Sequence, residues 1–230
     1  MRVTNVELHC DLPPAEANDL AADAGAFLGG VSQYLQVAPP SPRVYVFRNG
    51  RSLRLYLRRA CPVFSERTGA CFKTDDGGLV VAVSAGPGGR PDPHDLRHEL
   101  THAVLAARFA PPMPWLDEGL AQLFENGCPP GVDDNRLARL RRMGTGLDGR
   151  LVELVSKERH AQLDGTDYLV AWGVTWFLLN DRAFGRKKLL RCLEPGLLSE
   201  KAAHRFRRNL GETPQALAQR FCQFVRTASP

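Results

Sequence analysis

The sequence predicts an α+β fold, in which an N-terminal α/β region with a small sheet precedes a mainly helical region. Strand-like runs of β-branched and aromatic residues occur in the first half, whereas helical periodicity dominates after residue 93. A Gly- and Pro-rich stretch over 86–93 separates the two patterns, and we place the boundary there, between units at 1–90 and 91–230. With 230 residues, of which 43% are hydrophobic, the chain can bury a substantial core.

Turn residues separate the elements predicted in the N-terminal region. Pro13 and Pro14 favour the start of a helix that runs to about Tyr34. Asn49-Gly50 forms a turn after a short strand, and Asp75-Asp76-Gly77-Gly78 is a strong hairpin signal. The expected elements are strand 3–10, the helix ending near residue 34, strand 43–47, helix 51–58, and hairpin strands 69–74 and 79–83.

Beyond the boundary, apolar residues recur with helical spacing and no internal repeat is evident. The predicted helices lie at 94–109, 115–126, 133–143, 150–157, 167–182, 186–192, 199–209 and 214–227.

Composition narrows the class of protein. The net charge of +5 is mild and favours acidic partners only weakly. The longest apolar stretch, 168–179, is too short for a membrane span. The first nine residues alternate like a strand instead of forming the apolar run of a signal peptide.

The six cysteines contain no CxxC pair. Cys61 and Cys71 are the closest candidates for a disulfide, and free thiols are the alternative. The cellular compartment stays open.

The sequence His98-Glu99-Leu100-Thr101-His102 carries the clearest chemistry. Two histidines four residues apart lie on one face of a helix, about one turn apart, so that both imidazoles reach a single ion. Glu99 is offset around the helix and can address a metal-bound water without being a ligand.

A catalytic zinc needs a third protein ligand and an open position for water. The metzincin continuation is excluded, because Leu105 and Arg108 stand where that class has Gly and His. We instead select Glu118, since the proline-rich reversal at 111–114 can bring its helix alongside the first. Two rival carboxylates are Asp117, which points about 100° away from Glu118 on a helix, and Glu125, which is better placed to support a ligand than to be one.

The segment Trp115-Leu116-Asp117-Glu118-Gly119-Leu120-Ala121, together with the HExxH motif, resembles the gluzincin metallopeptidases. The layout of the whole chain is similar to the small peptidase-MA-like proteins of that group. The resemblance implies a zincin-like fold, one Zn²⁺ per chain held by His98, His102 and Glu118, Glu99 as general base, and a peptide or protein substrate. It also allows an exported protein.

Two departures from the aminopeptidase members of that group are visible. The interval from His102 to Glu118 is shorter, and the Gly-Ala-Met-Glu-Asn segment that anchors a free amino terminus is missing, so aminopeptidase activity is not carried over.

Gluzincins also use a Tyr or His to stabilise the oxyanion of the tetrahedral intermediate, and Tyr168 and His160 are the candidates here.

Several features have both a functional and a structural interpretation. Strand 79–84 either rims the substrate cleft with a free edge or is an ordinary buried strand. The spacing of Trp172 and Trp176 favours core packing over substrate contact. Arginine-rich runs at 136–150 and 205–208 favour solvated helix faces, so no nucleic acid is expected.

The leading hypothesis from the sequence is therefore a zinc metallopeptidase. The alternative is a zinc-stabilised binding or scaffold domain with little or no proteolytic activity.

Overall fold

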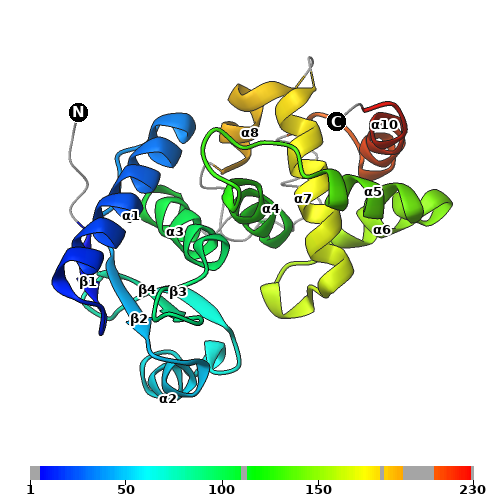
Figure 1. Ribbon diagram of the computed structural model, residues 1–230. Coiled ribbons are helices and arrows are strands. Elements are labelled where there is room, and N and C mark those ends of the chain that lie inside the picture. The colour runs from blue at the N-terminus through cyan, green and yellow to red at the C-terminus, as the bar shows by residue number, and fades with distance from the viewer. Residues whose placement is uncertain (1–5, 110–112, 182–183, 194–209, 229–230) are drawn as a thin grey trace. The chain divides into compact units, whose positions relative to one another are not determined.

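The computed structural model describes residues 6–109, 113–181, 184–193 and 210–228 (Figure 1). It has the α+β composition expected from the sequence. The chain divides into two compact units, Met1–Arg108 with Phe124–Pro130, and Phe109–Leu123 with Gly131–Pro230. The predicted division at residue 90 lies earlier in the chain, before the helix that carries His98 and His102.

A four-stranded mixed sheet forms the centre of the first unit. Its strands are β1 (Glu7–His9), β2 (Arg43–Phe47), β3 (Gly69–Lys73) and β4 (Leu79–Ser84), in the order β1-β2-β4-β3. β1, β2 and β4 are parallel, whereas β3 is antiparallel to β4 and forms the predicted hairpin with it. Because β4 is paired on both sides, the structure agrees with the buried-strand alternative, and the edge strand next to it is β3.

Helices cover both faces of this sheet. α1 (Pro14–Leu35) and α3 (Pro93–Arg108) pack on one face, and α2 (Gly50–Ala60) packs on the other, followed by the short 3-10 helix η1 (Pro62–Phe64) (Figure 1). All four residues from Val80 to Val83 are buried, as expected for a strand covered on both faces. α3 belongs to this unit because it packs against β3, β4 and α1.

The second unit is helical and is built around α7 (Gly165–Asn180), which is buried almost all round. The elements packed in this unit are α4 (Pro114–Phe124), α5 (Asp134–Arg142), η2 (Gly144–Gly146), α6 (Leu147–Leu154), η3 (His160–Gln162), α8 (Gly185–Leu193) and α10 (Pro214–Thr227). Each matches a predicted helix or a short turn between two of them; the helix predicted at 199–209 lies outside the described residues. Trp172 is fully buried, which confirms core packing for it, and the half-buried Trp176 stacks on Trp172 and packs against Phe224.

A buried ionic network fixes the start of α7. The Asp167 carboxylate is completely buried and lies 2.7 Å from Lys157 Nζ and 3.0 Å from an Arg150 nitrogen. Asp164 caps the helix by accepting hydrogen bonds from the backbone N–H groups of Thr166 and Asp167. The pKa of the Asp164 carboxyl is lowered to about 2. The hydrogen bond from the Arg150 side chain is the largest cause, and the two backbone hydrogen bonds add to it. The network therefore joins α6 and the segment after it to the first turn of α7.

Replacing the buried carboxylate should destabilise the second unit strongly. Asp167→Asn leaves the positive charges of Lys157 and Arg150 without their buried counter-ion, and we expect a loss of about 3 kcal/mol or more in the free energy of unfolding, measured by urea denaturation. Glu153→Gln is the matched control, because Glu153 pairs with the same two cations but is exposed, and it should lower the stability by less than about 1 kcal/mol. Equal effects of the two substitutions would contradict a special role for the buried position.

All six cysteines are free thiols, so Cys61 and Cys71 are not bonded. Burial raises the pKa of the Cys192 thiol to about 12, which makes this sulfur a packing group and not a nucleophile. Across residues 6–109, 113–181, 184–193 and 210–228, no helix combines the length and the apolar character that crossing a membrane requires.

Candidate metal centre

Helix α3 presents His98 and His102 on the same face. It begins after Asp92, whose side chain accepts a hydrogen bond from the His94 backbone N–H, and Leu100 is buried on its inner face. The four-residue spacing then brings the Nε2 atoms of His98 and His102 to 3.1 Å from each other. Two imidazole nitrogens that each bind one tetrahedral zinc at about 2.0–2.1 Å lie about 3.3 Å apart. The observed separation fits two ligands of a single ion.

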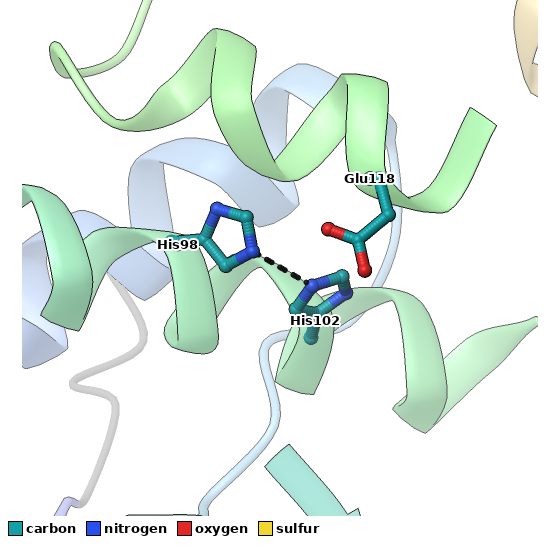
Figure 2. A group of neighbouring side chains, drawn as sticks. All are labelled: His98, His102 and Glu118. Atoms are coloured by element: carbon teal, nitrogen blue, oxygen red, sulfur yellow. Dashed lines mark hydrogen bonds between the residues drawn. The ribbon is translucent and has the colours of Figure 1, made fainter. Parts of the chain in front are cut away.

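The third side chain of the cluster is Glu118 from α4. One ligand atom each from His98, His102 and Glu118 can be chosen so that all lie within 4.8 Å of one another. Figure 2 shows the Glu118 carboxylate beside the His102 imidazole, with the two imidazoles facing each other. Glu118 is only 3% exposed, and a carboxylate held at that depth needs a cation or hydrogen-bond donors around it. Two imidazoles and one carboxylate are a donor set suited to zinc.

Glu118 is positioned by unusually close packing of α4. A Cβ atom added at Gly119 would lie 2.5 Å from the Ala171 carbonyl oxygen, and it would also collide with the Thr175 hydroxyl; both neighbours lie on α7. Only glycine fits there. Trp115 and Leu116, one turn before, are fully buried, so α4 is anchored from two directions. The same packing shows that Trp115 is a core residue.

Glu125 contacts the His98 ring nitrogen that is not the one next to His102. Its Oε1 atom lies 2.8 Å from His98 Nδ1, and the two side chains are 14% and 20% exposed. A carboxylate at Nδ1 favours the tautomer with the proton on that nitrogen, which leaves the Nε2 lone pair for a metal. The interpretation of Glu125 as a supporting carboxylate, and not a ligand, agrees with this geometry.

Removing this support should weaken metal binding without abolishing it. For Glu125→Gln we expect the affinity for Zn²⁺ to fall about 10- to 100-fold, because the amide no longer fixes the His98 imidazole as a carboxylate does. Competition with a chromophoric chelator measures the change. The conservative variant Glu125→Asp should retain more affinity than Glu125→Gln if the negative charge matters. An unchanged dissociation constant in Glu125→Gln would show that the hydrogen bond has no influence on the site.

Glu99 lies beside the first residue of the edge strand β3. A Cβ atom added at Gly69 would lie 2.8 Å from Glu99 Oε1 and 3.0 Å from its Cγ. The Glu99 side chain therefore occupies the space that a larger residue at position 69 would take. The sequence pattern marks Gly69 only as the start of a strand, because nothing in the sequence indicates which helix crosses that strand.

The two oxyanion candidates occupy different positions in the second unit. His160 Nε2 lies 2.8 Å from Asp117 Oδ2, so Asp117, the neighbour of Glu118 in sequence, orients an imidazole and is absent from the metal cluster. Tyr168 is half-buried in the first turns of α7, and its carbonyl accepts a hydrogen bond from Gln122 of α4. Both candidates are thus tied to α4, the helix that carries Glu118.

No protein-family model, no curated protein and no solved structure matches this chain.

Proposed function

We propose that this protein is a zinc-dependent peptidase of the gluzincin type, with a zincin-like fold. The observation that carries the proposal is the convergence of two imidazoles and one buried carboxylate from His98, His102 and Glu118. Glu99, which lies between the two histidines in sequence, is not needed to hold a metal. Its presence therefore favours a hydrolytic site over a purely structural metal site. The substrate class is a peptide or protein.

The chain's own residues have distinct roles in this reaction. His98, His102 and Glu118 would hold one Zn²⁺, which supplies Lewis acidity to water and to the scissile carbonyl. Glu99 accepts the proton of the attacking water and then donates it to the departing amine, so that the amide C–N bond breaks with a neutral leaving group. Glu125 keeps the His98 imidazole in the tautomer that presents Nε2 to the site.

A hydrogen-bond donor for the developing oxyanion completes the set. Tyr168 remains the first candidate, and His160 gains support from its contact with Asp117, because a carboxylate partner fixes the orientation of the imidazole. Comparing Tyr168→Phe with His160→Gln distinguishes the two, since only the true donor should lower kcat about 100-fold or more while zinc content is preserved.

Metal analysis followed by digestion of a diverse peptide library tests the proposal. We expect about one zinc per chain and hydrolysis that is lost with a chelator and regained with Zn²⁺. Folded wild-type protein that binds no zinc would overturn the proposal. Zinc binding without hydrolysis of any library member would instead support the zinc-stabilised binding or scaffold domain.

The contact between Gly69 and Glu99 predicts a variant that alters catalysis and little else. In Gly69→Ala the new methyl group meets the flexible end of Glu99, which can move away, so folding and zinc content should persist while the general base is displaced. A misplacement of about 1 Å can lower the rate about 100-fold, and we expect kcat to fall by up to that factor with little change in KM.

Gly131→Ala is the matched control for this variant. Nothing lies within 4 Å of a Cβ atom at position 131, and its activity should equal that of the wild type. If Gly69→Ala kept full activity, Gly69 would have no part in positioning Glu99. A loss of zinc in Gly69→Ala would instead assign the effect to the metal site.

A further inference from the structure

The outer side of α2 forms one continuous exposed stripe. Leu53 and Leu57 face inward and are completely buried against the sheet. The outward positions recur at intervals of three and four residues, so they lie on a single face of the helix, and Figure 1 shows this helix on the side of the sheet away from α1 and α3. We define the α2 face as the exposed residues of this stripe and of the turn after it: Arg51, Arg54, Leu55, Arg58, Arg59 and Val63.

The stretch of sequence that contains this face is basic and has no acidic residue of its own. Residues 43–65 contain six of the 30 basic residues and none of the 25 acidic ones. Since the chain carries +5 in total, the rest of the sequence has a formal charge of −1. Arg58 makes one long, exposed ion pair with Glu66, at 3.5 Å. Among the residues that the structure describes, Arg51, Arg54 and Arg59 form no ion pair, so their charges face solvent.

Two apolar side chains lie among these arginines. Leu55 is 54% exposed and Val63 is 82% exposed, the highest values among the large hydrophobic residues described. Leu55 has arginines one turn before it and one turn after it. The neighbouring aromatic residues Tyr56 and Phe64 instead pack against the hydrophobic cluster beneath the helix. The face therefore lacks the aromatic platform on which nucleic-acid bases stack, and combines cations with exposed aliphatic groups.

We propose that the α2 face binds the surface of a bilayer containing anionic phospholipids. Guanidinium groups bind phosphate and carboxylate groups of lipid head groups through paired hydrogen bonds. Leu55 and Val63 enter the boundary between head groups and acyl chains, as apolar residues of basic amphipathic helices do. α2 is already folded and packed on the sheet, so binding requires no ordering of the helix. This is a peripheral attachment that involves no membrane-spanning segment and does not depend on the proposed enzymatic activity.

Flotation of the full chain with phospholipid vesicles tests the charge requirement. We expect binding to phosphatidylcholine vesicles that contain phosphatidylserine, none to phosphatidylcholine alone, and weaker binding at high salt. Each arginine near such a surface contributes about fivefold in partitioning, so Arg51→Gln/Arg54→Gln should bind about 25-fold more weakly.

A matched pair of arginines on α5 provides the control. Arg139 and Arg142 have the same three-residue spacing and are exposed, so Arg139→Gln/Arg142→Gln removes the same charge elsewhere. This variant should float like the wild type. Equal losses in both double variants would show that net charge alone governs binding, and would overturn the assignment to the α2 face.

The exposed leucine separates a membrane from another anionic partner. Leu55→Ser should lower vesicle binding about fivefold, because about half of a leucine side chain no longer leaves water. The same variant should not change any retention on single-stranded RNA, which would depend on charge alone. If wild-type protein bound RNA tightly and failed to float with phosphatidylserine vesicles, the proposal would be wrong and the face would be a nucleic-acid site.

Discussion

Glu99→Gln should retain about one zinc per chain and lose peptide hydrolysis. The amide has nearly the shape of the carboxylate, but it cannot accept the proton of the attacking water. General-base catalysis contributes about 10²- to 10⁴-fold, and we expect kcat to fall within that range while KM stays near its wild-type value. Metal analysis and library digestion of the same preparation measure both quantities.

An exposed glutamate supplies the comparison for this variant. Glu158 lies at the surface of the second unit, and Glu158→Gln changes the formal charge by the same amount without touching the site. Its activity should equal that of the wild type. Hydrolysis that survives in Glu99→Gln would remove Glu99 from the mechanism even if zinc were present.

Glu118→Ala should lose the metal itself. The substitution removes the carboxylate of the three-residue cluster and leaves only His98 and His102, and two imidazoles hold zinc far more weakly than a complete set of three ligands. We expect the variant to come out of dialysis with less than about a tenth of a zinc per chain. Its circular dichroism spectrum should show whether helical content is retained.

The adjacent carboxylate tests the choice of ligand. Asp117→Ala removes an acidic group one residue away, which lies 2.8 Å from His160 and is not one of the three residues of the cluster. This variant should keep its zinc, and it should lose activity only if His160 serves as the oxyanion donor. If Asp117→Ala lost zinc and Glu118→Ala retained it, the assignment of the third ligand would be reversed.

The sequence predicted those features that depend on local chemistry. Helix periodicity and turn residues located the elements of both units within a few residues, including the hairpin around Asp75–Gly78. The spacing of His98 and His102, and the proline-rich segment before the helix of Glu118, predicted a cluster that the structure contains. Local spacing was sufficient here because both histidines share one helix.

Features that depend on which elements pack together were not predictable from spacing. The position of β4 between β2 and β3 is a matter of topology, and a buried strand and an edge strand carry the same β-branched pattern. Asp117 and His160 are 43 residues apart, and neither has a sequence signal that indicates its partner. The division at residue 90 followed the Gly- and Pro-rich loop, whereas packing against the sheet places α3 with the residues before it.

The contact of Gly119 with α7 bears on protein engineering. A designer who grafts the HExxH helix and the Glu118 helix onto another scaffold would transfer the ligands without the surface that positions the carboxylate. The recipient would also need a helix whose backbone is open at positions equivalent to Ala171 and Thr175, so that the ligand helix can approach it without a side chain between them. The minimal portable unit is therefore three helices, one of which contributes no ligand.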